Sequence, residues 1–483
     1  MEPNGRNRMV RLPVAVPPAG TVGLPAAGTA ALPTAVAVAA FGALAAASVV
    51  GWSLGSPNDA GRSVATAYVV QWSAFAVATL AVRRLPARRV VPWILAGGAL
   101  LQLLAVLWPP RTTDDFYRYA WDGRVQAHGI DPYRYAPTDP ALAGLRDDWL
   151  FPGGHTVLNH PAVRTIYPPV AQAYFLLVHA VAPGGRARPL QVAAALLAVG
   201  TAALLVVALR RYGGDPRAVV LWAWCPTVVL EAGNDAHVDV LGAFFVVAGL
   251  VVLAGTPGGR RALSTGRALA AGALLGAAVG VKFLPGLVAP ALARHRQRWW
   301  LATGATGLLA VAYLPHLLAV GPRVFGFLPG YLGEERFDGV DRYPLLGQVM
   351  PASWAPAAGA LVIAATALWV WWRADPGSPA RGAVVMVGVT FLVLTPEYPW
   401  YALLLVALAA LADQARWLAV AAAGWPPYLI GPLHWEPGPA RAVSYGIALG
   451  VVLAATLAVA AARAVARAPR DLSHQGHQAA DGW

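Results

Sequence analysis

Long apolar stretches separated by short polar clusters make up most of this chain. A transmembrane helix needs about 20 mostly apolar residues, and uncharged stretches of this kind recur from Pro33 to Ala462. The pattern predicts an all-α, polytopic membrane protein with about fourteen transmembrane helices. The predicted spans lie near residues 34–54, 64–82, 91–108, 189–209, 218–232, 238–255, 268–293 as a pair of short helices, 299–320, 354–372, 382–395, 400–413, 417–433 and 441–462.

Two apolar stretches need a different interpretation because simple crossings would invert the order of the basic clusters. We expect Tyr167 to Ala182 to form a re-entrant or surface helix within a long external loop, starting at Pro168 and Pro169, where proline suits a helix start. We expect residues 268–293 to form two helices of roughly 13 residues, about 20 Å each. They would meet near Lys282 and place it at an external tip.

Charge and composition agree with this topology. Only 12% of the residues are charged, against about 25% in ordinary soluble domains. The net charge of +13 comes from short arginine clusters between apolar stretches, as at Arg83 and Arg84, Arg210 and Arg211, and Arg294. Such clusters favour cytoplasmic loops, and no basic surface for nucleic acid is predicted. The single cysteine, Cys225, rules out an intrachain disulfide and favours a buried position.

The predicted domain organisation follows from the spans. We expect residues 1–33 to be a disordered cytoplasmic tail, residues 34–462 a single membrane domain, and residues 463–483 a second cytoplasmic tail. Residues 109–188 form the long first external loop with juxtamembrane helices. The loops at residues 234–239, 321–343, 396–400 and 434–441 face the same outer side.

The densest polar group, from Thr112 to Tyr135, lies in the first external loop. Helical spacing after Asp115 aligns Arg118, Tyr119 and Asp122 on one face, and Asp114 and Arg124 belong to the same polar group. Aromatic rings can hold sugar faces, arginines bind phosphate, and a carboxylate can act as a general base on a hydroxyl. The alternative is an amphipathic helix on the membrane surface.

A second polar group, EAGNDAHVD at residues 231–239, joins two predicted spans. Ionisable residues at membrane depth tend to mark function, so Asp235, His237 and Asp239 are candidates for substrate or cation contact. An ordinary turn is the alternative. Their spacing fits no specific metal signature, and we predict no metal. Lys282, in GVKFLPG, can balance a leaving phosphate, or can reach the interface by snorkelling.

Two further outer segments carry weaker signals. The PEYPWY run supplies Tyr398 and Trp400, which can line a lipid or sugar groove or anchor the chain at the interface. The polar loop from Glu334 to Tyr343, including Arg342, can be an acceptor-binding flap or a plain loop.

DDFYRYAWDG followed by HGIDPY resembles the first external loop of actinobacterial polyprenyl-phosphomannose-dependent α-mannosyltransferases, α-1,6-mannosyltransferases among them, of the GT-C superfamily. The YPP, NDAHVD, GVKFLPG and PEYPWY motifs are also similar. The resemblance implies a GT-C fold and an inverting transfer at the periplasmic face, with Asp115 as the base and Asp114 as the fallback. It also implies that His237 and Lys282 contact the donor phosphate and that Tyr167 lies at the substrate.

The same resemblance implies a polyprenyl-phosphate sugar as donor, a glycan or glycolipid as acceptor, and no other cofactor. The family's sugar is mannose, but the residues themselves do not separate mannose from glucose, galactose or arabinose. The rival interpretation is a secondary transporter, or a flippase or polymerase of lipid-linked glycans. A transporter would carry ionisable groups on interrupted helices in two related halves, and no second half is evident in the sequence.

Overall fold

The computed structural model describes residues 31–54, 57–184, 186–254, 264–334, 342–429 and 436–467, and every regular element within them is a helix. This confirms the all-α expectation for these residues. The α-helices are α1 (Ala31–Ser53), α2 (Pro57–Val82), α3 (Ala87–Leu107), α4 (Asp115–Ala127), α5 (Pro169–Val181), α6 (Ala187–Arg211), α7 (Val220–Ala223), α8 (Pro226–Val228), α9 (Asp239–Leu253), α10 (Thr265–Val281), α11 (Ala289–Leu292), α12 (Arg298–Val320), α13 (Leu328–Glu334), α14 (Ala355–Arg373), α15 (Pro379–Leu394), α16 (Ala402–Ala412), α17 (Leu418–Ala423), α18 (Trp425–Tyr428) and α20 (Pro437–Arg467).

Shorter helical turns connect these helices. One is a π-helical segment, Val229–Asn234, which follows α8. The others are 3-10 turns at Pro140–Leu145, Pro152–Gly154, Pro216–Val219, Leu284–Val288, Gly321–Phe325, Leu346–Gln348, Ala352–Trp354, Pro399–Tyr401 and Ala415–Trp417.

The predicted count of fourteen spans is not confirmed. Among the described residues, seven helices are long and apolar enough to cross a membrane, or eight if the bent pair Pro226–Asn234 and Asp239–Leu253 counts as one span. Prolines explain part of the difference, because proline removes a backbone donor and starts a new helix more readily than it continues one. Pro226 starts α8 inside the predicted span 218–232, and Pro426 lies at the start of α18 inside the span 417–433.

Of the two segments singled out in the sequence, the first has a short helix, as expected, whereas the second does not form the expected pair of 13-residue helices: α10 has 17 residues and α11 has four. Helix α5 has 13 residues and follows Pro168, so it is about 20 Å long and shorter than the roughly 30 Å hydrocarbon core. Helix α10 ends at Val281, and a 3-10 turn and the four-residue α11 follow it. Lys282 therefore lies at the break between two helical segments.

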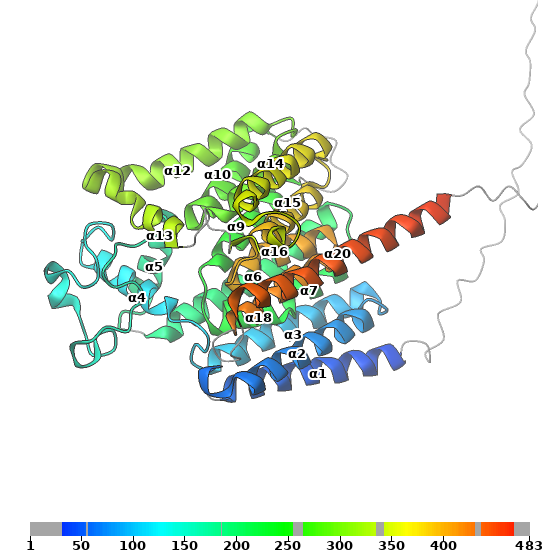
Figure 1. The fold of residues 1–483 in the computed structure, drawn as a ribbon, viewed down its shortest axis with the longest axis horizontal. Helices are drawn as coiled ribbons and strands as arrows, with labels where there is room; N and C mark the ends of the chain where they lie inside the picture. Colours follow the sequence, from blue (N-terminus) through cyan, green and yellow to red (C-terminus); the bar gives the residue numbers. More distant parts are fainter. Residues whose placement is uncertain are drawn as a thin grey trace, which may run out of the picture.

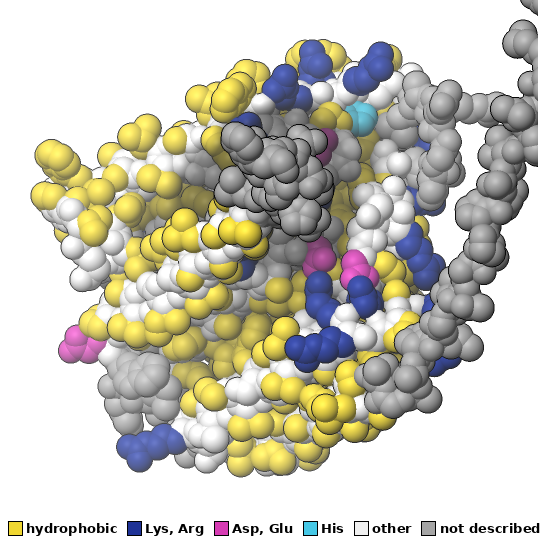
Figure 2. Space-filling view, turned by 90° about the vertical axis from the view of Figure 1, so that its right-hand side faces the viewer, with side chains coloured by type: hydrophobic (Ala, Val, Ile, Leu, Met, Phe, Trp, Pro, Cys, Tyr) yellow, Lys and Arg dark blue, Asp and Glu magenta, His cyan; other side chains and the backbone are white. Residues whose placement is uncertain are grey.

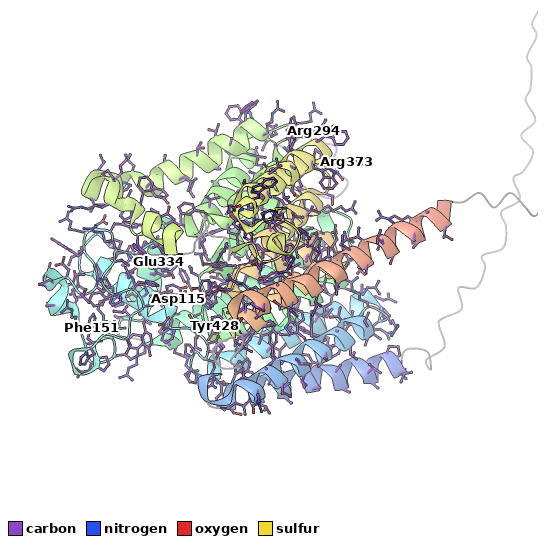
Figure 3. The ribbon with its side chains drawn as sticks, viewed as in Figure 1. Asp115, Phe151, Arg294, Glu334, Arg373 and Tyr428 are labelled. Carbon is purple, nitrogen blue, oxygen red and sulfur yellow. The ribbon has the colours of Figure 1, made fainter. Side chains whose placement is uncertain are left out.

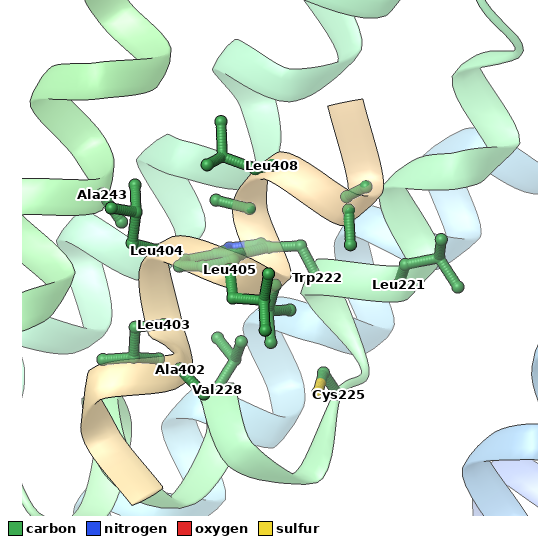
Figure 4. Close-up of a cluster of buried hydrophobic side chains, with 14 of the residues drawn as sticks. Leu221, Trp222, Cys225, Val228, Ala243, Ala402, Leu403, Leu404, Leu405 and Leu408 are labelled. Carbon is green, nitrogen blue, oxygen red and sulfur yellow. The ribbon is translucent and has the colours of Figure 1, made fainter. Parts of the chain in front are cut away.

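Helix α16 lies at the centre of the bundle, where it contacts α6, α7, α9 and α15. Ten of its residues, Ala402 to Leu411, are buried, which is typical of a helix that is apolar on every face. Its leucines lie beside Trp222 in a buried apolar cluster that also contains Cys225, and Cys225 is buried as predicted (Figure 4). By contrast, only Leu301 of α12 is buried, so most of that helix faces outward.

Close helix packing depends on glycine where α10 meets α12. A Cβ atom at Gly272 would lie 2.1 Å from the backbone oxygen of Leu301, and one at Gly304 would lie 2.1 Å from that of Leu269. Small residues of this kind let helix backbones approach in membrane proteins. This close packing fixes the position of α10, which ends directly before Lys282.

The loops gather at two opposite ends of the bundle (Figure 1). Helices α4 and α5 lie at the left end in that view, and the far end of α20 lies at the right. At the right-hand end, Arg83 pairs with Asp413 at 2.5 Å and Arg294 donates to the carbonyl oxygen of Trp372 at 2.6 Å. Figure 2, which faces this end, shows many Lys and Arg side chains and fewer Asp and Glu. The basic clusters and the polar motifs are thus separated, as the charge pattern predicts.

Candidate active site

A cavity of about 450 Å³ opens at the α4 end of the bundle. Figure 3 shows Asp115 and Tyr428 at this end and Arg294 and Arg373 at the other. The cavity lining combines polar, aromatic and apolar side chains. Its polar and aromatic lining includes Asp114, Asp115, Asn159, Tyr167, Lys282, Arg342, Tyr398, Trp400 and Tyr428, and its apolar lining includes Phe283, Leu284, Phe327, Phe391 and Leu394.

Asp115 is the carboxylate of the cavity lining that accepts the most side-chain hydrogen bonds. It lies in the first turn of α4, where the helix dipole favours a negative charge. Asn159 donates its side-chain N–H to Oδ1 at 2.6 Å. The hydroxyls of Tyr119 and Tyr167 each donate to Oδ2 at 3.3 Å. With 15% of its side chain exposed, Asp115 is both fixed in position and accessible to a ligand.

Asp114 is held less firmly. It precedes α4 without capping it, its side chain is exposed, and it accepts one hydrogen bond from Asn159 at 3.2 Å. Burial of part of the carboxyl and the adjacent charge of Asp115 raise its pKa above the usual value. Asp115 is therefore the more firmly held of the two candidate carboxylates.

Lys282 brings a positive charge to the cavity wall, but this charge is already paired. Its Nζ donates to both carboxylate oxygens of Asp239, at 3.0 and 2.9 Å, and lies 4.4 Å from the ring centre of Tyr401. The Lys282 side chain is 22% exposed and that of Asp239 is 6% exposed. Asp239 thus holds Lys282 in place, while the ammonium stays accessible from the cavity.

His237 lies behind the cavity wall and does not line it. Its ring is fully buried and stacks on Trp400, with ring centres 3.9 Å apart, and Trp400 stacks on Tyr398 at 4.7 Å. The His237 Nδ1 atom lies 3.7 Å from Asp115 Oδ2. The structure therefore places the imidazole beside the candidate base, and the phosphate contact expected from the sequence stays a prediction.

Asp235 connects the turn after the π-helical segment to the start of the external loop. It is fully buried and accepts hydrogen bonds from the backbone N–H of Arg111 at 2.8 Å and of Thr112 at 3.2 Å. The Thr112 hydroxyl also donates to it. In this structure Asp235 anchors the loop and does not line the cavity.

Three candidates from the first loop mainly hold that loop together. Arg118 pairs with Asp122 at 3.1 Å and donates to the carbonyl oxygens of His160 and Val163, although it also forms part of the cavity lining. Asp122 accepts a further hydrogen bond from Gln172 of α5 at 2.9 Å. Arg124 pairs with Asp147 at 2.6 Å, away from the cavity.

Arg342 is buried and lines the cavity on the side of α15, where its carbonyl oxygen accepts a hydrogen bond from Thr395 at 3.4 Å. Most of the predicted acceptor-binding flap, at residues 335–341, lies outside the described residues.

Asn159 and Glu231 contact predicted site residues but were not themselves predicted. Asn159 contacts both Asp114 and Asp115, and no sequence pattern around it signalled this. Glu231 opens the EAGNDAHVD motif and is fully buried, with Oε2 3.4 Å from His237 Nε2. Its signal was an acidic residue directly after an apolar stretch.

The fold and the site define a helical protein of membrane type with a cavity at one end that is lined by acidic, basic and apolar side chains. A family model, Glycosyltransferase family 87, matches residues 165–396. The match includes Tyr167, the 235–239 turn and Lys282, but not Asp115. No curated protein matches the chain.

Among solved structures, the chain is similar to ArnT from Cupriavidus metallidurans, crystallised bound to undecaprenyl phosphate. The two sequences are 17% identical, the match covers 75% of this chain and 76% of ArnT, and the TM-score is 0.42.

Proposed function

We propose that this chain is an integral membrane glycosyltransferase of GT-C type. It takes a hexose from a polyprenyl-phosphate carrier and transfers it to a hydroxyl of a lipid- or glycan-linked acceptor. The match to Glycosyltransferase family 87 supports the reaction class. The observation that carries the proposal is the single cavity lined by both Asp115 and Lys282. The resemblance of the first loop to polyprenyl-phosphomannose-dependent enzymes favours mannose.

The reaction needs a base on the acceptor side and a cation on the leaving-group side. Asp115 accepts the proton of the acceptor hydroxyl, whose oxygen then attacks the anomeric carbon. The bond from that carbon to the phosphate oxygen breaks, and its electron pair leaves with polyprenyl phosphate beside the ammonium of Lys282. Attack opposite the leaving group inverts the anomeric centre. Holding both substrates in one cavity lowers the barrier further through orientation.

The cavity is lined partly by apolar side chains, which suit the lipid part of such a donor. Phe283, Leu284, Phe327, Phe391 and Leu394 line it, and Phe283 is 46% exposed. Helices α12 and α14, most of whose residues are not buried, both lie at the top of the bundle in Figure 1. In this arrangement a polyprenyl chain passes from the bilayer to the cavity along apolar side chains.

The proposed site faces the outside of the plasma membrane. The arginine clusters gather at the opposite end of the bundle (Figure 2), and basic loops favour the cytoplasm. We therefore propose a periplasmic site and cytoplasmic termini, which accessibility labelling of single cysteines introduced at the two ends tests.

The direct test uses membranes that contain the full chain and come from a background without transferase activity of its own. They are incubated with labelled polyprenyl-phosphate mannose, glucose, galactose or arabinose in separate reactions. Transfer of one label to a lipid or glycan acceptor, and its loss in the Asp115→Asn variant, are the expected results. No transfer from any of the four donors, in membranes that supply acceptor glycolipids, would contradict the proposal.

One observation favours a second candidate, a secondary transporter. The helical segments Pro226–Asn234 and Asp239–Leu253 form a pair bent by 116°, with the ionisable groups Asp235 and His237 at the break. Broken helices of this kind bind substrates and ions in transporters. Uptake of free sugar into vesicles without any transfer from a lipid carrier would support this alternative.

A further inference from the structure

Three metal-ligating side chains converge behind the cavity. Glu231 comes from the π-helical segment, and Asp235 and His237 come from the turn that follows it. One ligand atom from each lies within 4.8 Å of the others, and His237 Nε2 and Glu231 Oε2 are 3.4 Å apart. All three residues are 0% exposed.

The cluster contains polar atoms that have no hydrogen-bond partner. Both carboxylate oxygens of Glu231 and both ring nitrogens of His237 are buried without one. Buried polar groups are nearly always hydrogen-bonded, and an uncompensated buried carboxylate costs several kcal/mol. The two carboxylates, at Glu231 and Asp235, also repel each other. A positive charge between them would satisfy the unpaired atoms and remove the repulsion.

Local backbone structure explains why the three side chains meet. The π-helical turn, a form that often occurs at functional sites, contains Glu231. Ala236 then adopts a left-handed conformation, with φ of 59°, which is uncommon for a residue with a side chain. Asp235 and His237 flank this residue. The hydrogen bonds from Arg111 and Thr112 fix the carboxylate of Asp235, as outer partners commonly fix metal ligands.

We propose that Glu231, Asp235 and His237 bind a divalent first-row transition-metal ion. One imidazole and two carboxylates suit ions such as Zn²⁺ or Mn²⁺, and three protein ligands leave coordination positions for water. The ion cancels the charge of the two carboxylates. Asp239, which sequence reasoning grouped with Asp235 and His237, does not contribute because its carboxylate is paired with Lys282.

The ion would hold His237 in place, and through it the cavity wall. The imidazole stacks on Trp400, and its Nδ1 atom lies near Asp115. Binding at Nε2 leaves Nδ1 protonated and directed toward the Asp115 carboxylate, which gives His237 a positioning role. The metal site goes beyond the proposed transferase function, and its test does not depend on that function.

The test measures metal in the purified full chain, prepared in detergent with an affinity tag that contains no histidine. Elemental analysis is expected to find one equivalent of a transition metal in the wild type. Glu231→Gln keeps the side-chain size but loses the charge, and it is expected to weaken affinity beyond the roughly 10- to 100-fold that loss of an outer partner costs. Asp413→Asn, at the opposite end of the bundle, is the matched control and is expected to keep the metal.

Thermal unfolding gives a second measurement that is valid even if a variant folds poorly. Wild-type protein stripped with a chelator is titrated with Zn²⁺ or with Mn²⁺, because an ion that binds only the folded state raises the melting temperature. A rise in the wild type and in Asp413→Asn, but not in Glu231→Gln, is expected.

Wild-type protein that holds no metal and shows no rise with either ion overturns the proposal. Metal fully retained by both Glu231→Gln and His237→Asn also overturns it, since the ion would then lie elsewhere. Neither measurement requires transfer activity, so failure of the metal site and failure of the transferase proposal remain distinguishable.

Discussion

Replacing Asp115 by asparagine removes the proposed base while keeping the shape of the side chain. A positioned general base contributes about 10²- to 10⁴-fold in rate, or about 3–5 kcal/mol at 1.36 kcal/mol per tenfold change. We therefore expect kcat of Asp115→Asn to fall by about 10²- to 10⁴-fold. The KM for the donor is expected to change little, because Lys282 and the apolar lining bind the donor.

The contacts of Asp115 indicate that this variant folds. The amide oxygen can still accept from Asn159 at the position of Oδ1. The new amide N–H group then faces the hydroxyls of Tyr119 and Tyr167, whose oxygens can accept hydrogen bonds. Because donors and acceptors exchange roles, the stability loss is expected to be about 1 kcal/mol.

The assay compares initial rates of sugar transfer with equal amounts of purified wild-type and variant protein. Melting temperatures measured in parallel separate loss of chemistry from loss of fold. Asp114→Asn is the matched control and is expected to keep most of the wild-type rate. Asp115→Asn with more than about a tenth of the wild-type kcat would refute a role as general base. An inactive Asp114→Asn beside an active Asp115→Asn would assign the base to the neighbouring carboxylate.

Three further predictions concern charge and packing. The pKa of Asp114 is raised by burial and by the adjacent carboxylate, so its ionisation weakens the folded state as the pH rises through the folded-state pKa. Asp114→Asn should therefore melt above the wild type at neutral pH, and the difference should vanish below about pH 4; an equal difference at both pH values would contradict this. Lys282→Met leaves Asp239 buried without a partner and should cost about 3–5 kcal/mol. The double variant with Asp239→Asn should recover the melting temperature but keep a raised KM for the donor, and a normal KM would exclude Lys282 from donor binding. Gly272→Ala should lower the melting temperature because its Cβ would lie 2.1 Å from a backbone oxygen of α12, whereas Gly266→Ala in the same helix meets no atom within 4 Å and should not; equal effects would disprove the close packing of the two helices.

Much of the outline of the fold was predictable from apolar length and charge. Spans predicted near residues 34–54, 189–209 and 299–320 correspond to α1, α6 and α12. The break at Lys282 was also predicted, because arginines flank that apolar segment on both sides. The prediction overcounted spans where prolines divide an apolar stretch, as before α8 and at α18. Hydrophobicity reports where a segment lies, but not whether its backbone stays helical.

The candidate site was predictable in composition but not in the partners of its residues. The polar motifs around Asp115 and Lys282 were identified from unusual charge near apolar segments, and both residues line one cavity. Arg124 was predicted to bind substrate, and its ion pair with Asp147 could not be foreseen. In the sequence, an arginine of an external loop looks the same whether its partner is a ligand or a carboxylate. Asn159 gave no signal because a single amide in a polar loop has no distinguishing pattern.

The sequence by itself determined that the chain is helical, apolar over membrane-length segments and basic between them, because these properties depend on neighbouring residues and on the solvent around each segment. The tertiary structure decided which charges meet. Lys282 pairs with Asp239 from a different helix, and His237 lies between Glu231 and Asp115 beneath Trp400. Such contacts depend on helix packing and on the backbone conformation of one turn, and a linear pattern of polar residues does not encode either.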